Sequence, residues 1–493
     1  MFHLNTIPQT LINHSLTVRQ ERRQLLKTFW LAVTVLFLGG LFAMQTSSIA
    51  SIGCAILIAF AALLPMYLWC SNSALGMPIF PIFALTYLWT HALPLLSDNK
   101  KNITYSPEQN IFASVTVAGF LLLGTFTWFQ FVKSSPAAPK SYRVLRGRES
   151  EGFFLIILTS GVLFNISSLG GWLFLEGGTF SLARSLILGL NVLSVFVLSY
   201  RCGTRELSAS KSNIFWILIA LYIITSAASL LLFNALSVVL LVAIAFVMGR
   251  QQVPWLPIIL VLICISFLHY GKAEMRAKYW GGFQQHFVQT WEYPALYGEW
   301  IDYSFKYLSN KKGRKESEQK ASFLERSSVI QMLLIAQTKT PKDVPYLGGK
   351  TYAIIPRLLI PRILNSNKIR SHEGTSLLSI HYGLQTRKAT LSTTIGWGLL
   401  SEAYANFGLT GCAGLAIILG AVYGQMTRWS LNTPLLSSRS LFGVLMINCA
   451  SQTEWTAGVF VSALFQSVVI LVGITLVFMK FQKNEDILLI YDE

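Results

Sequence analysis

Apolar residues gather into long runs along this chain, and short polar or charged stretches separate the runs. A helix needs about 20 predominantly apolar residues to cross the hydrocarbon layer of a bilayer. Such runs recur from residue 28 to residue 480. They predict an all-α polytopic membrane protein with about twelve transmembrane helices, at 28–46, 49–69, 77–96, 111–132, 153–175, 180–200, 213–232, 234–249, 253–270, 405–426, 437–452 and 457–480.

The composition agrees with this pattern. Of the 493 residues, 53% are apolar and 12% are charged, and the mean hydropathy is +0.53. A soluble domain carries roughly a quarter charged residues. The first apolar run follows a basic segment, is long enough to span, and lacks a small-residue cleavage site, so we expect no cleavable signal peptide. The six cysteines form no CxxC pair, and we expect neither a metal site nor a disulfide scaffold.

The short connections differ in charge, and this difference predicts the orientation. Lys and Arg gather before the first run, at 133–152 and at 201–212, whereas the alternate connections are short or carry few charges. Because Lys and Arg in short loops remain on the cytoplasmic side, we expect both termini to be cytoplasmic. The chain then divides into an N-terminal bundle of about nine spans (1–270), a large extracytoplasmic loop (271–395) and about three C-terminal spans (396–493).

The large loop is strongly basic. It holds 19 Lys and Arg against 9 Asp and Glu, a net charge of +10. Loops of this length are exempt from the charge rule for orientation and are usually functional. The charge is explained either by a solvated face against anionic lipid or by an anionic substrate. Eleven aromatics at 279–307 and an amphipathic pattern at 321–340 predict interfacial helices in the loop.

Several cations in and beside the loop are candidates for binding phosphate. Lys272 and Arg276 lie four residues apart, so on a helix they share one face. Arg can bind a phosphate through two parallel hydrogen bonds. Ordinary snorkelling at a helix end is the alternative. Arg326 lies in the first turns of the helix predicted at 321–340, and Arg184 lies in the outer half of the sixth span.

The stretch "IPRLLIPRIL" (355–364) places Arg357 and Arg362 in an apolar setting, each directly after a proline. Proline disfavours the α conformation in the residue before it, so we expect short rigid pieces at the membrane surface. A poorly hydrated, geometrically fixed Arg favours pyrophosphate recognition. The alternative is a pair of interfacial turns with snorkelling arginines.

Candidate acids and bases lie near the end of the loop. His372 or His381 can act as a general base toward a sugar hydroxyl, although lone loop histidines are often simply polar surface. Glu402 lies close to the start of the tenth span, where an ionisable residue is a functional candidate. Tyr404 and Asn406 are its near neighbours.

Three motifs, in this order and spacing, resemble the O-antigen polymerase (Wzy-type) family of bacterial oligosaccharide repeat-unit polymerases. They are "GKAEMRAKYW", "YLGGKTYAIIPRLLIPR" and "GLLSEAYANFG". The family pattern is Lys-x-x-x-Arg after a span, Gly-x-Thr-Tyr before Pro-Arg, and Glu-Ala-Tyr-x-Asn-Phe-Gly opening the next span. The resemblance covers 271–411 together with the layout of many spans and one large loop. The chain departs from the family where "PRILNSNKIR" replaces Pro-x-Lys-Pro, which leaves the roles of Arg362 and Lys368 open.

The resemblance implies a glycosyltransferase at the outer face of the bacterial cytoplasmic membrane. It would transfer the growing glycan from undecaprenyl pyrophosphate to the sugar hydroxyl of an incoming lipid-linked unit, without a metal or other cofactor. His381, His372 or Glu402 would deprotonate that hydroxyl. The expected pyrophosphate- or glycan-binding residues are Arg184, Lys272, Arg276, Arg326, Arg357, Arg362, Tyr404 and Asn406. The implied partners are the lipid-linked oligosaccharide, the bilayer, and flippase and chain-length regulator proteins, but no nucleic acid.

Three alternatives remain open at this point. An O-antigen ligase would share the donor and the architecture and use another acceptor; the polymerase is preferred because its motifs match better. A lipid-linked oligosaccharide flippase or other transporter usually shows internal repeats and broken paired spans, and we find no convincing repeat. The third alternative is a purely structural partner of a polysaccharide-export complex.

Overall fold

Helices make up most of the chain. The computed structural model describes residues 9–483 apart from residues 45, 47, 97–104, 146–148, 174–176, 251, 281–286, 310–327, 361–364, 366–367 and 392. The helices before the loop are α1 (Gln9–Ala43), α2 (Ile49–Cys70), α3 (Ile79–Tyr87), α5 (Pro107–Val132), α6 (Glu149–Leu169), α7 (Gly177–Gly203), α8 (Ala209–Ala228), α9 (Leu232–Arg250) and α10 (Trp255–Trp280). A π-turn, η1 (Leu88–Ala92), and a 3₁₀ turn, η2 (Leu93–Leu95), continue α3.

The loop and the C-terminal part contain shorter elements as well. The loop helices are η3 (Thr290–Glu292), α11 (Tyr293–Ser309), α13 (Ile330–Lys339), α14 (Lys350–Ala353), α15 (Ile355–Leu359), α16 (Glu373–His381) and η6 (Ala389–Leu391). After them come α17 (Leu399–Ser430), α18 (Ser438–Ala450) and α19 (Ala457–Val477). The two strands are β1 (Ser141–Val144) and β2 (Lys480–Lys483).

Nine helices in the described part of the chain are long and apolar enough to cross a membrane: α1, α2, α5, α6, α7, α8, α10, α17 and α19. This confirms a polytopic, helical, membrane-embedded protein. The other predicted spans, 77–96, 234–249 and 437–452, fall on α3 with its turns, α9 and α18, which do not reach that length and apolarity. The count of twelve spans therefore stays a prediction.

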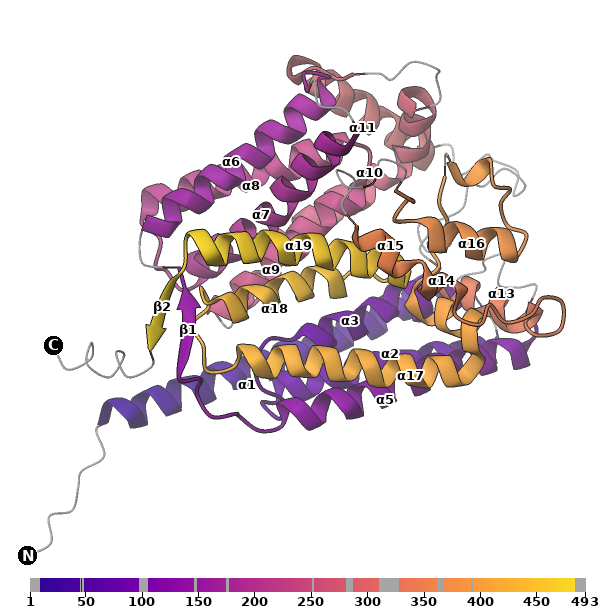
Figure 1. The fold of residues 1–493 in the computed structure, drawn as a ribbon, viewed down its shortest axis with the longest axis horizontal. Helices are drawn as coiled ribbons and strands as arrows, with labels where there is room; N and C mark the ends of the chain where they lie inside the picture. Colours follow the sequence, from indigo (N-terminus) through magenta and orange to yellow (C-terminus); the bar gives the residue numbers. More distant parts are fainter. Residues whose placement is uncertain are drawn as a thin grey trace, which may run out of the picture.

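The long helices lie side by side, with β1 and β2 at one end of the molecule and α13 to α16 at the other (Figure 1). β1 pairs antiparallel with β2, with Ser141 opposite Lys483 and Val144 opposite Lys480. Arg143 also donates a hydrogen bond to the carbonyl of Thr475, 332 residues further along the chain. The basic connection at 133–152 and the C-terminal segment, both predicted to be cytoplasmic, therefore lie together. Which face of a membrane they occupy stays a prediction.

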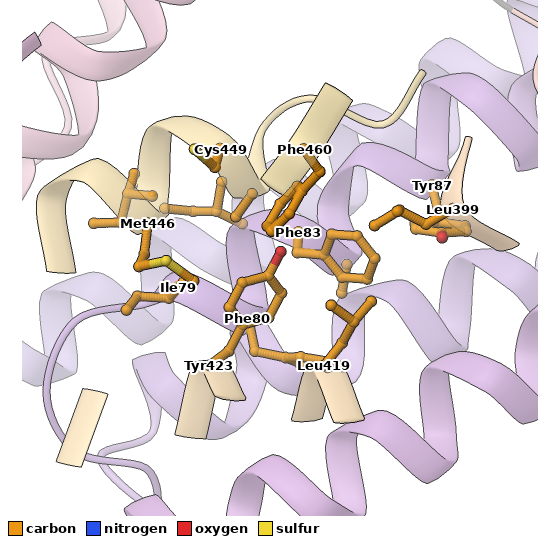
Figure 2. Close-up of a cluster of buried hydrophobic side chains, with 14 of the residues drawn as sticks. Ile79, Phe80, Phe83, Tyr87, Leu399, Leu419, Tyr423, Met446, Cys449 and Phe460 are labelled. Atoms are coloured by element: carbon orange, nitrogen blue, oxygen red, sulfur yellow. The ribbon is translucent and has the colours of Figure 1, made fainter. Parts of the chain in front are cut away.

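Aromatic packing fills the centre of the bundle. Phe80 of α3 stacks on Trp128 of α5, with ring centroids 5.8 Å apart, and its ring edge meets Tyr423 of α17. Figure 2 shows how α3, α17, α18 and α19 contribute side chains to one buried cluster. α5 and α17 approach closely at two glycines, since a Cβ on Gly420 would lie 2.5 Å from the carbonyl oxygen of Gly124. Small residues permit such close contact between membrane helices.

Buried charges join α6, α7 and α8 at their ends nearest β1. Glu151 accepts hydrogen bonds from Arg201 (3.3 Å) and Lys211 (2.7 Å). Only 5% of the Glu151 side chain and 10% of the Arg201 side chain are exposed. A buried carboxylate with two cationic partners is adequately compensated, whereas loss of the Glu151 carboxylate would take from Arg201 its buried partner and leave it the exposed carboxylate of Glu206 at 3.7 Å.

The ninth predicted span is longer than its apolar run. α10 continues to Trp280, beyond the predicted end at 270, and α11 packs along this extension. Trp300 donates to the carbonyl of Leu268 (2.6 Å), and the N–H of Gly271 donates to Ser304 Oγ (3.1 Å). Part of the aromatic-rich segment is therefore a helix against α10, and its position at a membrane interface stays a prediction.

Candidate functional site

The tenth predicted span begins with a sharp reversal of the chain. Gly408, inside α17, has φ +63° and ψ −146°, which no residue of a continuous helix adopts. Gly411 lies against Ala403, because a Cβ on Gly411 would be 2.5 Å from that carbonyl oxygen. Cys412 Sγ lies 3.9 Å from the carbonyl oxygen of Leu400. In a straight helix residues twelve apart would be separated by about 18 Å along the axis, so α17 is a helical hairpin.

We call residues 399–407 the return helix. Glu402, Tyr404 and Asn406 all lie on it, before the reversal at Gly408, rather than at the start of a straight span. Each is buried, with 0%, 6% and 1% of its surface exposed. A side chain at 408 is excluded by backbone conformation and by contact, since a Cβ would lie 2.9 Å from the hydroxyl oxygen of Tyr346.

The reversal frees backbone carbonyls of the return helix, and the loop uses them. Ala405 and Asn406 accept hydrogen bonds from the N–H groups of Leu347 (3.0 Å) and Gly348 (3.2 Å). The side-chain oxygen of Asn406 accepts from the N–H of Gly349 (3.0 Å). Gly348 and Gly349 have φ of +58° and +87°, a region that favours glycine. The Leu-Gly-Gly turn is therefore fixed by the return helix.

Asn406 also holds the residues that follow this turn. Its Nδ2 donates to Thr351 Oγ1 (2.9 Å) and to the carbonyl of Glu402 (2.8 Å). The ring of Tyr352 stacks on Phe407, with centroids 6.1 Å apart and planes within 4°. The motifs Gly-x-Thr-Tyr (349–352) and Glu-Ala-Tyr-x-Asn-Phe-Gly (402–408), about 50 positions apart in the chain, therefore form one packed unit, which we call the motif unit. Sequence reasoning singled out Asn406 but not Thr351 as its partner.

Glu402 joins this unit to two further helices. Its Oε2 accepts a hydrogen bond of 2.6 Å from the N–H of Ala457, the first residue of α19. Gly374 of α16 packs beside it, since a Cβ there would lie 3.8 Å from Glu402 Oε1. Next to these residues, the hydroxyls of Thr375 and Thr456 are 3.1 Å apart. A carboxylate at the N-terminus of a helix is stabilised by the helix dipole and by unpaired N–H groups. The surroundings of Glu402 are those of a structural anchor.

Arg357 lies on α15, which packs against α19. Arg357 itself is exposed. Leu358 is 2% exposed and packs on the first turn of α19, where a Cβ on Gly458 would lie 3.0 Å from Leu358 Cδ1. Within the described residues the Arg357 guanidinium makes no hydrogen bond or ion pair. The expectation that the residue before each proline is not helical is wrong for Ile355, which opens α15 because Pro356 lies in the first turn, where proline is tolerated. Ile360 is extended, as expected before Pro361.

The two candidate histidines flank α16. His381 Nε2 lies 2.9 Å from the carbonyl oxygen of Pro345, so this nitrogen carries the proton and donates it. His372 is solvent-exposed and directly precedes α16. Partial desolvation by the surrounding protein lowers the pKa of His372 below its ordinary value. The imidazole of His372 is therefore neutral, and able to accept a proton, near neutral pH.

The cations of α10 are engaged with the bundle. Arg276 donates through Nε (3.1 Å) and Nη2 (2.8 Å) to the carbonyl of Leu230, just beyond the C-terminus of α8. Lys272 attracts the carboxylate of Glu454, in the connection between α18 and α19. The carbonyl of Glu454 accepts from the N–H of Gly398, which directly precedes the return helix. Lys272 therefore lies near the motif unit, and Arg276 binds the backbone just beyond the C-terminus of α8.

The remaining predicted residues are placed as follows. Arg184 lies on α7 with an exposed side chain that has no partner among the described residues. Tyr404 lies with its ring centroid 6.4 Å from that of Tyr346. Arg326 and Arg362 lie outside the described residues. The structure thus brings the motif unit, Arg357, both histidines and Lys272 to one end of the molecule, around α14 to α17.

Comparison with known proteins adds no relative. No family model matches the chain, and neither the curated proteins nor the solved structures give a significant match to it. The resemblance to O-antigen polymerases accordingly rests on the motifs themselves.

Proposed function

We propose that the protein is a membrane glycosyltransferase that polymerises lipid-linked oligosaccharide repeat units. The growing glycan, held by a polyprenyl pyrophosphate, would be transferred to a sugar hydroxyl of an incoming lipid-linked unit. The observation that carries the proposal is Arg357, an exposed guanidinium without a protein partner among the described residues, on a helix packed against α19. A fixed, unpaired Arg suits a diphosphate, to which it can donate two parallel hydrogen bonds.

The reaction breaks the bond between the anomeric carbon of the donor glycan and the pyrophosphate oxygen. The acceptor hydroxyl oxygen forms the new bond to that carbon, its proton passes to a base, and the pyrophosphate leaves on the lipid with its electron pair. Negative charge grows on the leaving group in the transition state, and cations placed beside it lower the barrier. Arg357 has this role in the proposal, and Lys272 adds positive charge nearby.

His372 is the base that the geometry favours among the three candidates. It is exposed, its imidazole makes no hydrogen bond with the described residues, and its pKa is lowered, so the ring is unprotonated at neutral pH. The ring of His381 is engaged in a hydrogen bond to the Pro345 carbonyl, and Glu402 is fully buried and accepts from the N–H of Ala457. We therefore assign Glu402, together with Asn406, to positioning the loop rather than to proton transfer.

Purified full-length protein in nanodiscs, given a polyprenyl-pyrophosphate-linked repeat unit, tests the proposal. Polymerisation predicts a ladder of lipid-linked glycans that differ by one repeat unit. A single transfer to an added lipid acceptor, without a ladder, would indicate a ligase instead. Movement of the lipid-linked unit across sealed vesicles without new glycosidic bonds would indicate a transporter and contradict the proposal.

A further inference from the structure

A small basic hollow lies beside α16 on the part of the loop that follows Arg357. Its volume is about 150 Å³, and a cavity of that size can hold one six-membered ring. Side chains of three cations, one carboxylate and two hydroxyl residues line it: Lys368, Arg370, Glu373, Ser376, Arg387 and Thr390. Three positive charges and one negative charge leave it with a net charge of +2.

The hollow is built by interactions that fix its cations. Arg387 Nη1 pairs with Glu373 Oε1 at 2.6 Å, which holds the 387–391 segment against the start of α16. Arg370 Nη1 donates to the carbonyl of Leu391 at 3.3 Å, across the same gap. One nitrogen of Arg370 is thereby used, and the others of its five N–H donors remain for a ligand. Ser376 and Thr390, at 7% and 5% exposed, form the buried side of the hollow.

The hollow lies next to the proposed reaction site. Ser371, adjacent to Arg370, and Leu358, adjacent to Arg357, both pack on Gly458, where a Cβ would lie 3.6 Å from the Ser371 carbonyl oxygen and 3.0 Å from Leu358 Cδ1. α16 presents Glu373 and Ser376 to the hollow, and Gly374, the residue directly after Glu373, packs beside Glu402. A glycan chain that begins at Arg357 would therefore pass the hollow within a few sugar units.

We propose that the basic hollow binds a carboxylate-bearing sugar of the glycan substrate, so that the preferred repeat unit is acidic. The identification of the ligand as a glycan rests on the proposed function, whereas the anion preference rests on the lining residues. Guanidinium and ammonium groups around a space for one ring match a carboxylate on a pyranose. The hydroxyl of Ser376 matches a ring hydroxyl, and that of Thr390, which donates to the Arg387 carbonyl at 2.7 Å, can accept from another. A neutral sugar would leave the cations without their ligand.

Binding of soluble disaccharides to the purified full-length protein tests this inference without requiring catalysis. The probes are a glucuronosyl-glucose disaccharide and its neutral glucosyl-glucose counterpart, compared by calorimetric titration at low ionic strength. We expect the acidic probe to bind about tenfold tighter or more, the value of one charge-assisted hydrogen bond. Equal binding of the two probes would overturn the inference.

Variants separate the hollow from the rest of the basic loop. Arg370→Ala should abolish the preference for the acidic probe, whereas Lys388→Ala, which removes an exposed cation that does not line the hollow, should leave it unchanged. Glu373→Gln removes the only carboxylate among the lining residues, while its amide oxygen can still accept the hydrogen bond from Arg387 that holds the hollow together, and it should tighten binding of the acidic probe on the order of fivefold. A gain of affinity cannot result from misfolding, so no gain in Glu373→Gln would count against the site.

Two further arms identify the source of the anion and separate the two proposals. If vesicles of anionic lipid displace the acidic probe at concentrations at which neutral vesicles do not, the hollow binds lipid headgroups and the sugar assignment is wrong. Acidic-probe binding through the hollow, without a glycan ladder from any repeat unit, would contradict the polymerase and retain the sugar site. A ladder from acidic and neutral repeat units alike, together with equal binding of the two probes, would retain the polymerase and contradict the sugar site.

Discussion

The carboxylate of Glu402 accepts a hydrogen bond from the backbone N–H of Ala457, with Oε2 and N 2.6 Å apart. This contact joins the return helix to the first turn of α19, and Asn406, one turn further along, holds the Leu-Gly-Gly turn and Thr351. The loop segments that carry Arg357 and His372 pack against these same elements. Glu402 therefore determines where the candidate site lies, without being part of its accessible surface.

Substitution of Glu402 separates a positioning role from a catalytic one. Glu402→Gln keeps an oxygen that can accept from Ala457, so we expect a folded protein with a substantial part of its activity. Glu402→Ala leaves the N–H of Ala457 buried without an acceptor and should destabilise the protein by about 1–3 kcal/mol. Thermal unfolding of the purified variants in detergent, alongside the ladder assay, measures both effects.

The alternative role for Glu402 has a distinct signature. If Glu402 were the general base, Glu402→Gln would unfold at the wild-type temperature and yet form no glycan product. That result would contradict the positioning role.

The reversal at Gly408 makes a second prediction. Gly408→Ala introduces a side chain at φ +63° and 2.9 Å from the hydroxyl oxygen of Tyr346, so the return helix cannot keep its place. We expect a lower unfolding temperature and protease sensitivity at 347–352, since the carbonyls that hold this segment move. Gly414→Ala, on the same helix with open space around a Cβ, is the matched control and should behave as wild type.

The sequence predicted the membrane class and the longest spans, because period and length of an apolar run depend on local residues only. It could not predict the helical hairpin, since the apolar run of the tenth span continues through Gly408, and neither the positive φ of Gly408 nor its contact with Tyr346 has a local signal. The engagement of Arg276 by Leu230, 46 residues away, was equally inaccessible. The local sequence around Arg276 is compatible with snorkelling or phosphate binding, and a contact with the C-terminal end of α8 has no local signal.

The candidate site was predicted in part for the same reason. The residues of the two motifs could be named from the resemblance to O-antigen polymerases, but their mutual contact through Asn406 and Thr351 depends on tertiary structure. The pairing of β1 with β2 joins two four-residue segments that have no strand pattern of useful length. Burial of Glu402, which changes its assignment from base to anchor, also has no local signal.

His372 provides a test in the pH dependence of the rate. Desolvation lowers the pKa of His372, so its imidazole is neutral at neutral pH and above. The rate should therefore fall only when the pH drops below the ordinary histidine pKa of about 6.5. His372→Ala should reduce the rate by about a hundredfold or more and remove this acidic limb. An unchanged pH profile in His372→Ala would exclude it as the base, and His381→Ala is the matched control.

The buried charges at the other end of the molecule predict a stability effect unrelated to the site. Glu151→Ala removes the buried carboxylate that pairs with Arg201 and leaves it the exposed carboxylate of Glu206 at 3.7 Å, so the substitution should destabilise the protein by up to about 3–5 kcal/mol. Glu299→Ala, which removes the partner of the exposed Lys278, should have a much smaller effect on unfolding because such pairs are screened by solvent. Equal unfolding temperatures for the two variants would contradict the burial of the Glu151 cluster.

The glycan ladder formed by Arg357→Ala, compared with Lys342→Ala, tests the central claim most directly. Both substitutions remove one exposed cation from the same loop, and Lys342 lies apart from α15 in the connection after α13. The comparison uses variants that unfold at the same temperature as the wild type. We then expect Arg357→Ala to form no product longer than the starting unit and Lys342→Ala to form the full ladder. A full ladder from Arg357→Ala would contradict its assignment to the pyrophosphate and, with it, the proposed site.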